Sequence, residues 1–298
     1  MDTALRTLIY GIIDGAILAM PSVGFSLQFG VTNYVNFAYG AFITLGAFWG
    51  MLIGRQLHAG FWISLIGAGV IMAFISFVVG VGIYSPFSKK RPQLLFGLVL
   101  TFSAWLIVDN IMVAIWGENY YTLPSANVAS RLFHLGPVPI SSFQLEYVAI
   151  ALVLLGALYG LLHHTRFGIS MRATSDDTSL ASVCGLNLLA LRGGTWLITG
   201  FVAGVSGVVL ANQTGSFTTG LGDEFIYLVV AATILGGIGR PEGAVLGALI
   251  IGLTSDIAVP LIGAALSPAL IFAVLLALMG LRPGGVFGAV GRGRFGNA

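Results

Sequence analysis

One serine, Ser206 in the stretch GVSG (204–207), stands in a pattern that can carry the nucleophile of an intramembrane protease. That chemistry needs a histidine base within hydrogen-bond reach, placed on a later helix. The four histidines of this chain all precede Ser206: His58, His134, His163 and His164. Three of the four belong to loops or helix ends. We therefore expect Ser206 to be a small packing residue, and we expect the chain to have no catalytic residue.

The sequence also lacks a pattern for an energy source or a metal. The two lysines, Lys89 and Lys90, stand in SKKRPQ and belong to no phosphate-binding loop. The ligand spacings HExxH and paired Cys/His are missing, and the single Cys184 cannot form an internal disulfide. We expect no metal and no cofactor in this chain, so any ATP and its Mg²⁺ must be bound by another polypeptide.

The composition is that of a membrane protein. The 298 residues are 57% hydrophobic and only 8% charged, against roughly 25% charged in a soluble domain. The formal net charge of +2 is too small to indicate a nucleic-acid partner. We predict an all-α, polytopic helical bundle that forms a single transmembrane domain over residues 1–298 and contacts membrane lipids.

Apolar stretches of about 20 residues mark the expected membrane spans. The sequence predicts about eight to ten of them, which we place near residues 8–29, 36–54, 61–84, 94–116, 143–163, 195–211, 224–239, 243–262 and 268–281. Glycines four residues apart, such as Gly46, Gly50 and Gly54, predict close packing between helices, inside the bundle or between subunits.

The distribution of cations predicts the orientation. If the polar passage 166–187 is cytoplasmic, ten Lys/Arg residues fall inside (89, 90, 91, 166, 172, 192, 240, 282, 292 and 294) and three outside (6, 55 and 131). This excess satisfies the positive-inside rule. We therefore expect the amino terminus outside and the carboxyl terminus inside.

Polar residues interrupt the first two apolar stretches in GVTNYVNFAYG (30–40). Asn33 and Asn36 are poor helix formers that hydrogen-bond nearby backbone. Irregular backbone at membrane depth is tolerated where it is buried in protein or lines a watery cavity. One hypothesis is that Asn33, Asn36, Tyr39 and Gly40 line a substrate pathway, and the other is that this segment is a cytoplasmic turn.

Three aspartates lie inside or near the ends of apolar stretches: Asp14, Asp109 and Asp256. A carboxylate at membrane depth is costly, so each must find a partner or water. Asp109 is expected at a solvated rim. Asp14 lies deeper, which makes it a further candidate for the pathway, and an ion-coupled carrier would depend on it.

The passage RFGISMRATSDDTSLASVCGLN (166–187) is the longest polar stretch of the chain. Thr174 with Asp177 predicts the start of a helix of roughly ten residues, with Asp176 and Asp177 in its first turn and Gly185 beyond its end. On the residues alone, this cytoplasmic helix could dock a soluble partner or be a solvated connector.

Three stretches resemble the permease subunits of bacterial ABC importers for branched-chain amino acids. MRATSDDTSLASVCGLN with ITGFVAGVSGVVLA is similar to the family's cytoplasmic coupling loop and the helix that follows it. FGVTNYVNFAYGAFITLGAF (29–48) and LGGIGRPEGAVLGALIIGL (235–253) are similar to two further motifs in the family's order. The resemblance implies that the loop at about 164–194 carries the coupling helix, shaped by Arg172, Ala173, Asp176, Asp177, Ala181 and Gly185.

The resemblance also implies the partners. It implies a second permease subunit in a heterodimer, two ATP-binding subunits on the cytoplasmic face, and a periplasmic or lipid-anchored solute-binding protein, all at the bacterial inner membrane. Tyr39 stands where the family usually has histidine, and Arg240 and Glu242 replace smaller or apolar residues. The solute could therefore differ from leucine, isoleucine or valine. A secondary transporter or channel is the alternative to an ATP-driven permease.

Overall fold

The computed structural model describes residues 2–84, 94–124, 132–135, 138–263 and 266–281. The first part of the chain forms α1 (Asp2–Thr32), α2 (Tyr39–Gln56), α3 (Phe61–Val78) with the π-helix η1 (Val79–Tyr84), and α5 (Leu94–Trp116). A short hairpin of β1 (Leu132–Leu135) and β2 (Val138–Ser141) precedes α6 (Ser142–His164), α7 (Arg166–Asp176) and α8 (Thr178–Val183). The last elements are α9 (Leu188–Thr214), α10 (Leu221–Gly236), α11 (Pro241–Ile262) and α12 (Ser267–Leu281).

The fold is a helical membrane bundle, as the sequence predicted. Within the described residues, six helical segments are long and apolar enough to span a membrane. The other predicted spans are helices too, but they are shorter: α2 has 18 residues, α10 has 16 and α12 has 15. The antiparallel hairpin β1–β2, in which Phe133 pairs with Ile140, is the part of the fold that the all-helical prediction missed.

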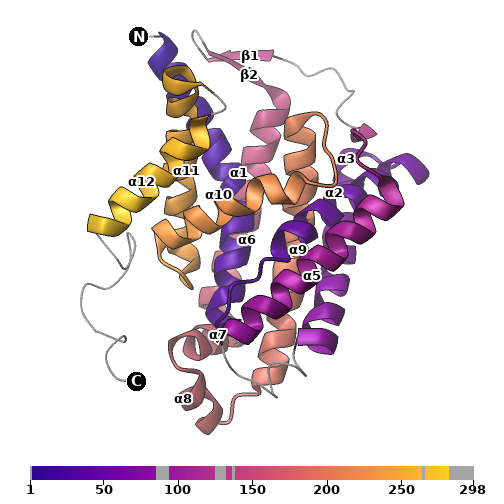
Figure 1. Ribbon diagram of the computed structural model, residues 1–298, viewed down its shortest axis with the longest axis vertical. Coiled ribbons are helices and arrows are strands. Elements are labelled where there is room, and N and C mark those ends of the chain that lie inside the picture. Colours follow the sequence, from indigo (N-terminus) through magenta and orange to yellow (C-terminus); the bar gives the residue numbers. More distant parts are fainter. Residues whose placement is uncertain (1, 85–93, 125–131, 136–137, 264–265, 282–298) are drawn as a thin grey trace.

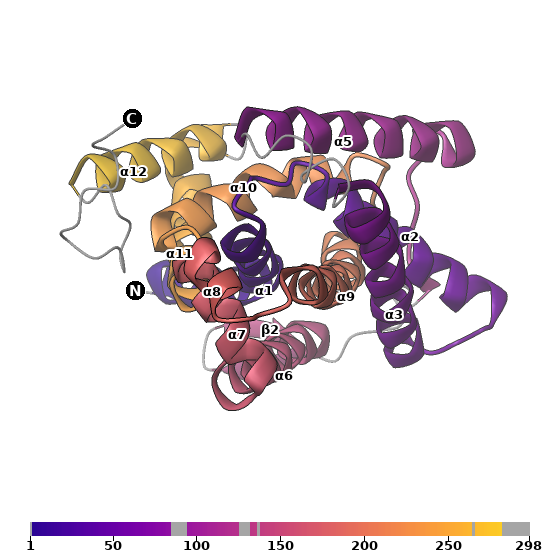
Figure 2. The same ribbon diagram turned by 90° about the horizontal axis from the view of Figure 1, so that it is seen from below.

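Helices α1 and α9 occupy the middle of the bundle. Seen from below in Figure 2, α2 and α3 lie on one side of α9, α6 and α7 lie below the central pair, and α10, α11 and α12 lie beside α1. Helix α1 packs mainly on α11, and α9 packs mainly on α3 and α2. The amino terminus and the pair α7–α8 lie at opposite ends of the molecule (Figure 1).

Glycines allow the central helices to approach closely. A Cβ atom on Gly46 would lie 2.6 Å from the Cα atom of Gly204, and one on Gly204 would lie 2.9 Å from the Cα atom of Gly69. Since these distances are too short for a side chain, α2, α9 and α3 meet backbone to backbone. The predicted glycine packing is thus an internal contact of the bundle at this place.

The basic side chains of the described segments divide between the two ends. Arg166 and Arg172 lie on α7, and Arg192 lies one turn into α9, next to the α7–α8 end. Arg6 is near the start of α1, and Arg55 is in the last turn of α2. Arg240 directly precedes α11, and the remaining counted cations, residues 89, 90, 91, 131, 282, 292 and 294, lie outside the described residues.

Candidate functional site

The segment between α1 and α2 is an irregular turn held by its own asparagines. Asn33 has a left-handed backbone (φ 61°) and its N–H donates to the Phe29 carbonyl, which ends α1. Asn36 then prepares the start of α2, since its side-chain oxygen accepts from the Ala38 N–H at 3.1 Å. The predicted interruption of the helix is therefore present, and it has the local hydrogen bonds that asparagine favours.

This turn runs back along α1 instead of leaving it. Tyr39, the first residue of α2, packs edge-on against Phe25, and its hydroxyl lies where a side chain on Gly24 would be. Gly24 is eight residues before the end of α1, a distance of about 12 Å along the helix. Helix α2 thus begins well inside the bundle, so the turn is more than a connection at its surface.

The turn buries polar groups, and the described protein provides hydrogen-bond partners for only some of them. Asn36 is 2% exposed, and its Nδ2 donates to Gln28 Oε1 at 3.2 Å. The Gln28 Nε2 and the Tyr39 hydroxyl are buried and have no hydrogen-bond partner among the described residues. An unpartnered buried polar group costs about 1–3 kcal/mol, so these groups mark a place where a polar ligand or water gains most.

Of the four predicted residues in this segment, Asn33 is exposed, whereas Asn36, Tyr39 and Gly40 are buried. Gly40 lies at the crossing of α2 with the start of α10: a Cβ on Gly40 would lie 2.9 Å from the Gly222 carbonyl oxygen, and a Cβ on Gly222 would overlap the Gly40 carbonyl oxygen. The Gly222 N–H donates to Thr44 Oγ1 at 2.8 Å. The structure thus brings Asn36, Tyr39 and Gly40 together with two residues that sequence reasoning missed, Thr44 and Gly222.

A second turn faces the first. Residues 215–220 join α9 to α10, and Phe217 in this turn forms a backbone bridge with Tyr121. Ile43 packs on Gly207 while its neighbour Thr44 holds Gly222, so α10 begins about two turns back from the end of α9. The sequence signal for this turn was the glycine-rich TGLGD (219–223) after an apolar helix.

Asp14 is not part of this cluster. It lies ten residues before Gly24, beside which the Tyr39 hydroxyl lies, and this spacing corresponds to roughly 15 Å along α1. Its Oδ1 accepts from Gln213 Nε2 at 2.8 Å, and this bond joins α1 to the end of α9. Asp14 therefore has the hydrogen-bond partner that a carboxylate in an apolar stretch requires, and this partner lies apart from the cluster at Asn36 and Tyr39.

The other acids of the spans also lie at surfaces or junctions. Asp223, which the sequence analysis did not single out, accepts from the Trp105 indole N–H at 2.6 Å and so ties α10 to α5. Asp256 lies opposite Gly11 of α1. Within the described residues, no group of three His, Cys, Asp or Glu side chains could hold a metal ion.

The passage 166–187 forms two helices, so the prediction of one helix from about residue 175 was wrong. Thr165 caps α7 by accepting from the Gly168 N–H at 3.0 Å. Helix α7 therefore starts earlier and includes Thr174, whose hydroxyl donates to the Ser170 carbonyl at 2.8 Å. Because Thr174 lies inside α7, the N–H groups next to it already bond within that helix. Thr174 therefore has no free helix N–H to cap.

Helix α8 is capped by Asp177 instead. The Asp177 Oδ1 accepts from the N–H groups of Ser179 and Leu180 at 2.9 and 3.0 Å, so this carboxylate stands at the N-cap and not in the first turn. Asp176 ends α7, and its side chain lies outside the described part of the protein. The prediction for Gly185 is confirmed, since it has φ 83° directly after the end of α8.

The predicted coupling residues are therefore spread over both helices. Arg172 and Ala173 are exposed on α7, and Ala181 is buried on α8. The end of α7 touches two further segments: a Cβ on Gly30 of α1 would lie 2.8 Å from Ser175 Oγ and 3.2 Å from the Gly239 carbonyl. Three segments, α1, α7 and the α10–α11 turn, thus meet at one junction.

A second contact, between α6 and α11, lies next to this junction. His163 Nε2 at the end of α6 lies 2.9 Å from the Glu242 carboxylate in the first turn of α11. Glu242 was noted only as a departure from the resembling family's pattern. An exposed pair of this kind contributes little to stability, but it fixes the position of α6 relative to α11.

Ser206 lies in the packed face of α9. Its side chain is fully buried, and in the described chain its hydroxyl has no hydrogen-bond partner that could act as a base. It sits between Gly204 and Gly207, which contact the backbones of α3 and α2. This environment fits a small packing residue.

The sequence as a whole matches one protein family. Residues 7–279 match the family described as branched-chain amino acid transport system, permease component. The probable branched-chain amino acid transport permease protein LivH of Methanocaldococcus jannaschii is 26% identical over 259 residues, which cover 83% of this chain and 80% of that protein. No solved structure matches the chain.

Two bacterial relatives are similar over nearly their whole length. They are the high-affinity branched-chain amino acid transport system permease proteins BraD of Pseudomonas aeruginosa, 22% identical, and LivH of Escherichia coli K12, 23% identical. Each alignment covers 297 residues and 95% of both chains. A permease of this kind implies ATPase and solute-binding partners. The chain belongs to the branched-chain amino acid transport permease family, and it is a multi-pass, non-catalytic membrane component of an ABC transporter.

Proposed function

We propose that this permease carries branched-chain amino acids, or related small polar solutes, along the turn between α1 and α2. The observation that carries this proposal is a group of buried polar atoms at that turn, Gln28 Nε2 and the Tyr39 hydroxyl, which have no hydrogen-bond partner among the described residues and lie beside the buried Asn36. A zwitterionic solute offers both donors and acceptors for such atoms. Irregular backbone deep in a helical bundle is typical of transporter binding sites.

The substrate is proposed from the relatives and from Tyr39. Three relatives are described as branched-chain amino acid permeases, and their identity to this chain is low enough for the solute to differ. Tyr39 is fully buried against α1. Its ring would limit the size of a solute near Asn36, whereas its hydroxyl could hydrogen-bond one.

The helices α7 and α8 are the proposed docking surface for the ATP-binding subunits. They leave three large apolar side chains exposed, Ile169 at 52%, Leu180 at 61% and Val183 at 84%, next to the exposed cations Arg166 and Arg172. Exposed apolar groups rimmed by charge are typical of protein interfaces. We propose that Ala173, Asp176, Asp177, Ala181 and Gly185 give this surface its shape.

The assembly follows from this surface. We propose two ATP-binding subunits, which hold ATP and Mg²⁺, a second permease in a heterodimer, and a periplasmic or lipid-anchored solute-binding protein. The whole chain, residues 1–298, would act as one permease domain in the bacterial inner membrane. The grouping of Arg166, Arg172, Arg192 and Arg240 near the α7–α8 end supports a cytoplasmic position for that end, with the amino terminus outside and the carboxyl terminus inside.

The switch between outward-open and inward-open states would start at α7. Closure of the ATP-binding subunits would move α7 and α8 as a body, and the junction of Ser175 with Gly30 and Gly239 would pass this movement to α1 and α11. Rigid-body movement of packed helices is a common form of such switching. The turn at Asn33–Asn36, directly after Gly30 on the chain, would then change shape.

The test is uptake by the reconstituted transporter with alanine at Asn36. We expect the variant to assemble with its ATPase subunits and to import solute at least about tenfold more slowly, because Asn36 links two polar groups of the path through bonds of about 1 kcal/mol each. Asn110→Ala on the exposed face of α5 is the matched control. Unchanged uptake by Asn36→Ala at unchanged expression would remove the pathway proposal.

The family match makes ATP-driven transport the function, and the ion-coupled secondary transporter that the sequence left open is kept only as the alternative for a test. The partly buried Asp14, bonded to Gln213, is the observation that favours it, since a carboxylate within a membrane span is a common element of ion coupling. Uptake in vesicles that lack ATPase subunits distinguishes the two functions.

A further inference from the structure

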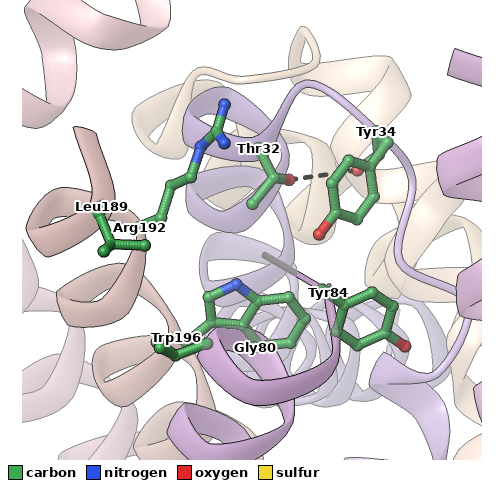
Figure 3. Close-up of a pocket in the computed structure, with 8 residues that line it drawn as sticks. Thr32, Tyr34, Gly80, Tyr84, Leu189, Arg192 and Trp196 are labelled. Atoms are coloured by element: carbon green, nitrogen blue, oxygen red, sulfur yellow. Dashed lines mark hydrogen bonds between the residues drawn. The ribbon is translucent and has the colours of Figure 1, made fainter. Parts of the chain in front are cut away.

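A small cavity lined by an arginine, two tyrosines and a tryptophan lies at the α7–α8 end of the bundle, apart from the group at Asn36 and Tyr39. It is enclosed by Thr32 and Tyr34 from the turn after α1, by Gly80, Val81 and Tyr84 from η1, and by Leu189, Arg192 and Trp196 from α9. Figure 3 shows these side chains around one space. The end of α1 with its turn, η1 and α9 therefore each form one wall of the cavity.

The aromatic wall of the cavity is closely packed. The rings of Tyr84 and Trp196 are stacked, with centroids 5.0 Å apart and planes at 14°, and the Tyr34 ring lies 6.2 Å from that of Tyr84. Gly80 lies directly over the indole, so a side chain at Gly80 would overlap Trp196. The π-helical geometry of η1 at Gly80 and Tyr84 is of the kind that occurs often at functional sites.

Arg192 is the charged group of the cavity. Its Nε is buried and has no hydrogen-bond partner within the described residues, and it forms no ion pair with an acid described there. Arg192 as a whole is partly exposed, and charged residues near a membrane span generally mark a functional path. The guanidinium group is also the side chain best suited to bind a carboxylate through two parallel bonds.

The tyrosines add hydroxyl groups that, like the guanidinium group, can donate hydrogen bonds to a carboxylate. The Tyr84 hydroxyl is buried without a partner in the described structure. The Tyr34 hydroxyl points toward the space above the Trp196 ring, as Figure 3 shows. One fixed positive charge with hydroxyl donors and an aromatic floor fits an anionic group attached to an apolar body.

We propose that this cavity binds the carboxylate of the transported solute on the release side of the pathway, with Arg192 as its counter-ion. The proposal rests on the proposed function, because it takes the solute to be an amino acid. The cavity has a volume of about 10 Å³, room for about one water molecule, because the aromatic walls are close together in this state. Binding therefore accompanies the movement of the turn and η1 that opens the path inward.

The experiment pairs a change in the protein with a change in the ligand. Leucine and leucinol, which has a CH₂OH group in place of the carboxylate, are titrated into the complete, nucleotide-free transporter in nanodiscs of neutral lipid. We expect the wild-type protein to bind leucine at least about tenfold more tightly than leucinol, since a hydrogen-bonded charge pair contributes that much. Arg192→Gln should lose this preference by weakening leucine binding alone.

Two further variants keep the result interpretable. Arg192→Lys retains the charge without the planar fork and should keep part of the preference, and it serves with Tyr34→Phe if Arg192→Gln does not assemble. Arg55→Gln is the control, because Arg55 lies at the end of α2 and donates to the Thr122 carbonyl. It should bind both ligands as the wild-type protein does.

The outcomes separate this site from the proposed function. If the wild-type transporter imports leucine with ATP but Arg192→Gln still prefers leucine over leucinol by the wild-type factor, only the site is refuted. If the wild-type protein neither imports nor binds leucine, both proposals fail. If the leucine preference is the same in every variant while Arg192→Gln alone loses a response of the ATPase to added anionic lipid, Arg192 holds a lipid headgroup and the site is again refuted.

Discussion

The Thr44 hydroxyl oxygen lies 2.8 Å from the Gly222 amide nitrogen. This hydrogen bond joins the second turn of α2 to the first turn of α10, the two helices that begin inside the bundle after irregular turns. The amide of Gly222 is one of the N–H groups at a helix start that has no partner within its own helix. Thr44 therefore satisfies a buried donor at the point where the two interrupted segments cross.

Replacing Thr44 by valine removes this acceptor and keeps the shape of the side chain. We expect Thr44→Val to destabilise the protein by about 1–3 kcal/mol, because the Gly222 N–H stays buried without a partner. Thr44→Ser retains the hydroxyl and should stay close to wild type. Thermal unfolding of the purified protein in one detergent measures both, and equal midpoints for the valine and serine variants would contradict the role of this bond.

Loss of the α8 cap should weaken the docking surface. Asp177→Ala removes the acceptor for the Ser179 and Leu180 N–H groups, a change that costs about 0.5–2 kcal/mol of helix stability. Hydrogen exchange in residues 178–184 should become faster, and less ATPase subunit should co-purify. Asp177→Asn, which can still cap, is the control. Normal co-purification together with fast exchange would show that α8 is not needed for docking.

Much of this fold was predictable because long apolar stretches have few alternatives at membrane depth. Every predicted span corresponds to a helix, and the break at Asn33 and Asn36 occurs where two weak helix formers stand together. The glycine spacing of α2 also found its contact, since Gly46 packs on Gly204 of α9. These features depend on local sequence or on one repeated spacing.

Features that depend on contacts between distant segments were not predictable. Nothing near Tyr39 in the sequence indicates that its ring would be held against Gly24 of α1, or that Gly222 would bond to Thr44. The helix start at Thr174 was misplaced for a local reason: Thr165 caps an earlier helix, and sequence patterns alone do not rank two competing caps. Asp14 was grouped with the pathway because of its depth in the apolar stretch, whereas its partner Gln213 lies at the C-terminal end of α9.

The junction of α1 with α7 should control the efficiency of transport more than ATP hydrolysis. Gly30→Ala places a Cβ 2.8 Å from Ser175 Oγ and 3.2 Å from the Gly239 carbonyl oxygen, so Ser175 must change rotamer or α7 and the α10–α11 turn must shift. We expect the amount of solute imported per ATP to fall by about two- to thirtyfold, the range for changes within a coupled network, with ATPase activity retained. Gly160→Ala on α6, with open space around it, is the control. Equal coupling in both variants would exclude this junction.

Asp14 distinguishes the two modes of energy supply. In Asp14→Asn, the amide oxygen can still accept from Gln213 Nε2, which lies 2.8 Å from Asp14 Oδ1, so the contact between α1 and α9 should survive while the charge is lost. For an ATP-driven permease we expect uptake by the complete transporter to continue near the wild-type rate. An ion-coupled carrier would instead show proton- or sodium-driven uptake in vesicles without ATPase subunits, and this uptake would disappear in Asp14→Asn. Since both measurements use the same variant, a loss of ATP-driven uptake with normal folding would place Asp14 in the transport mechanism after all.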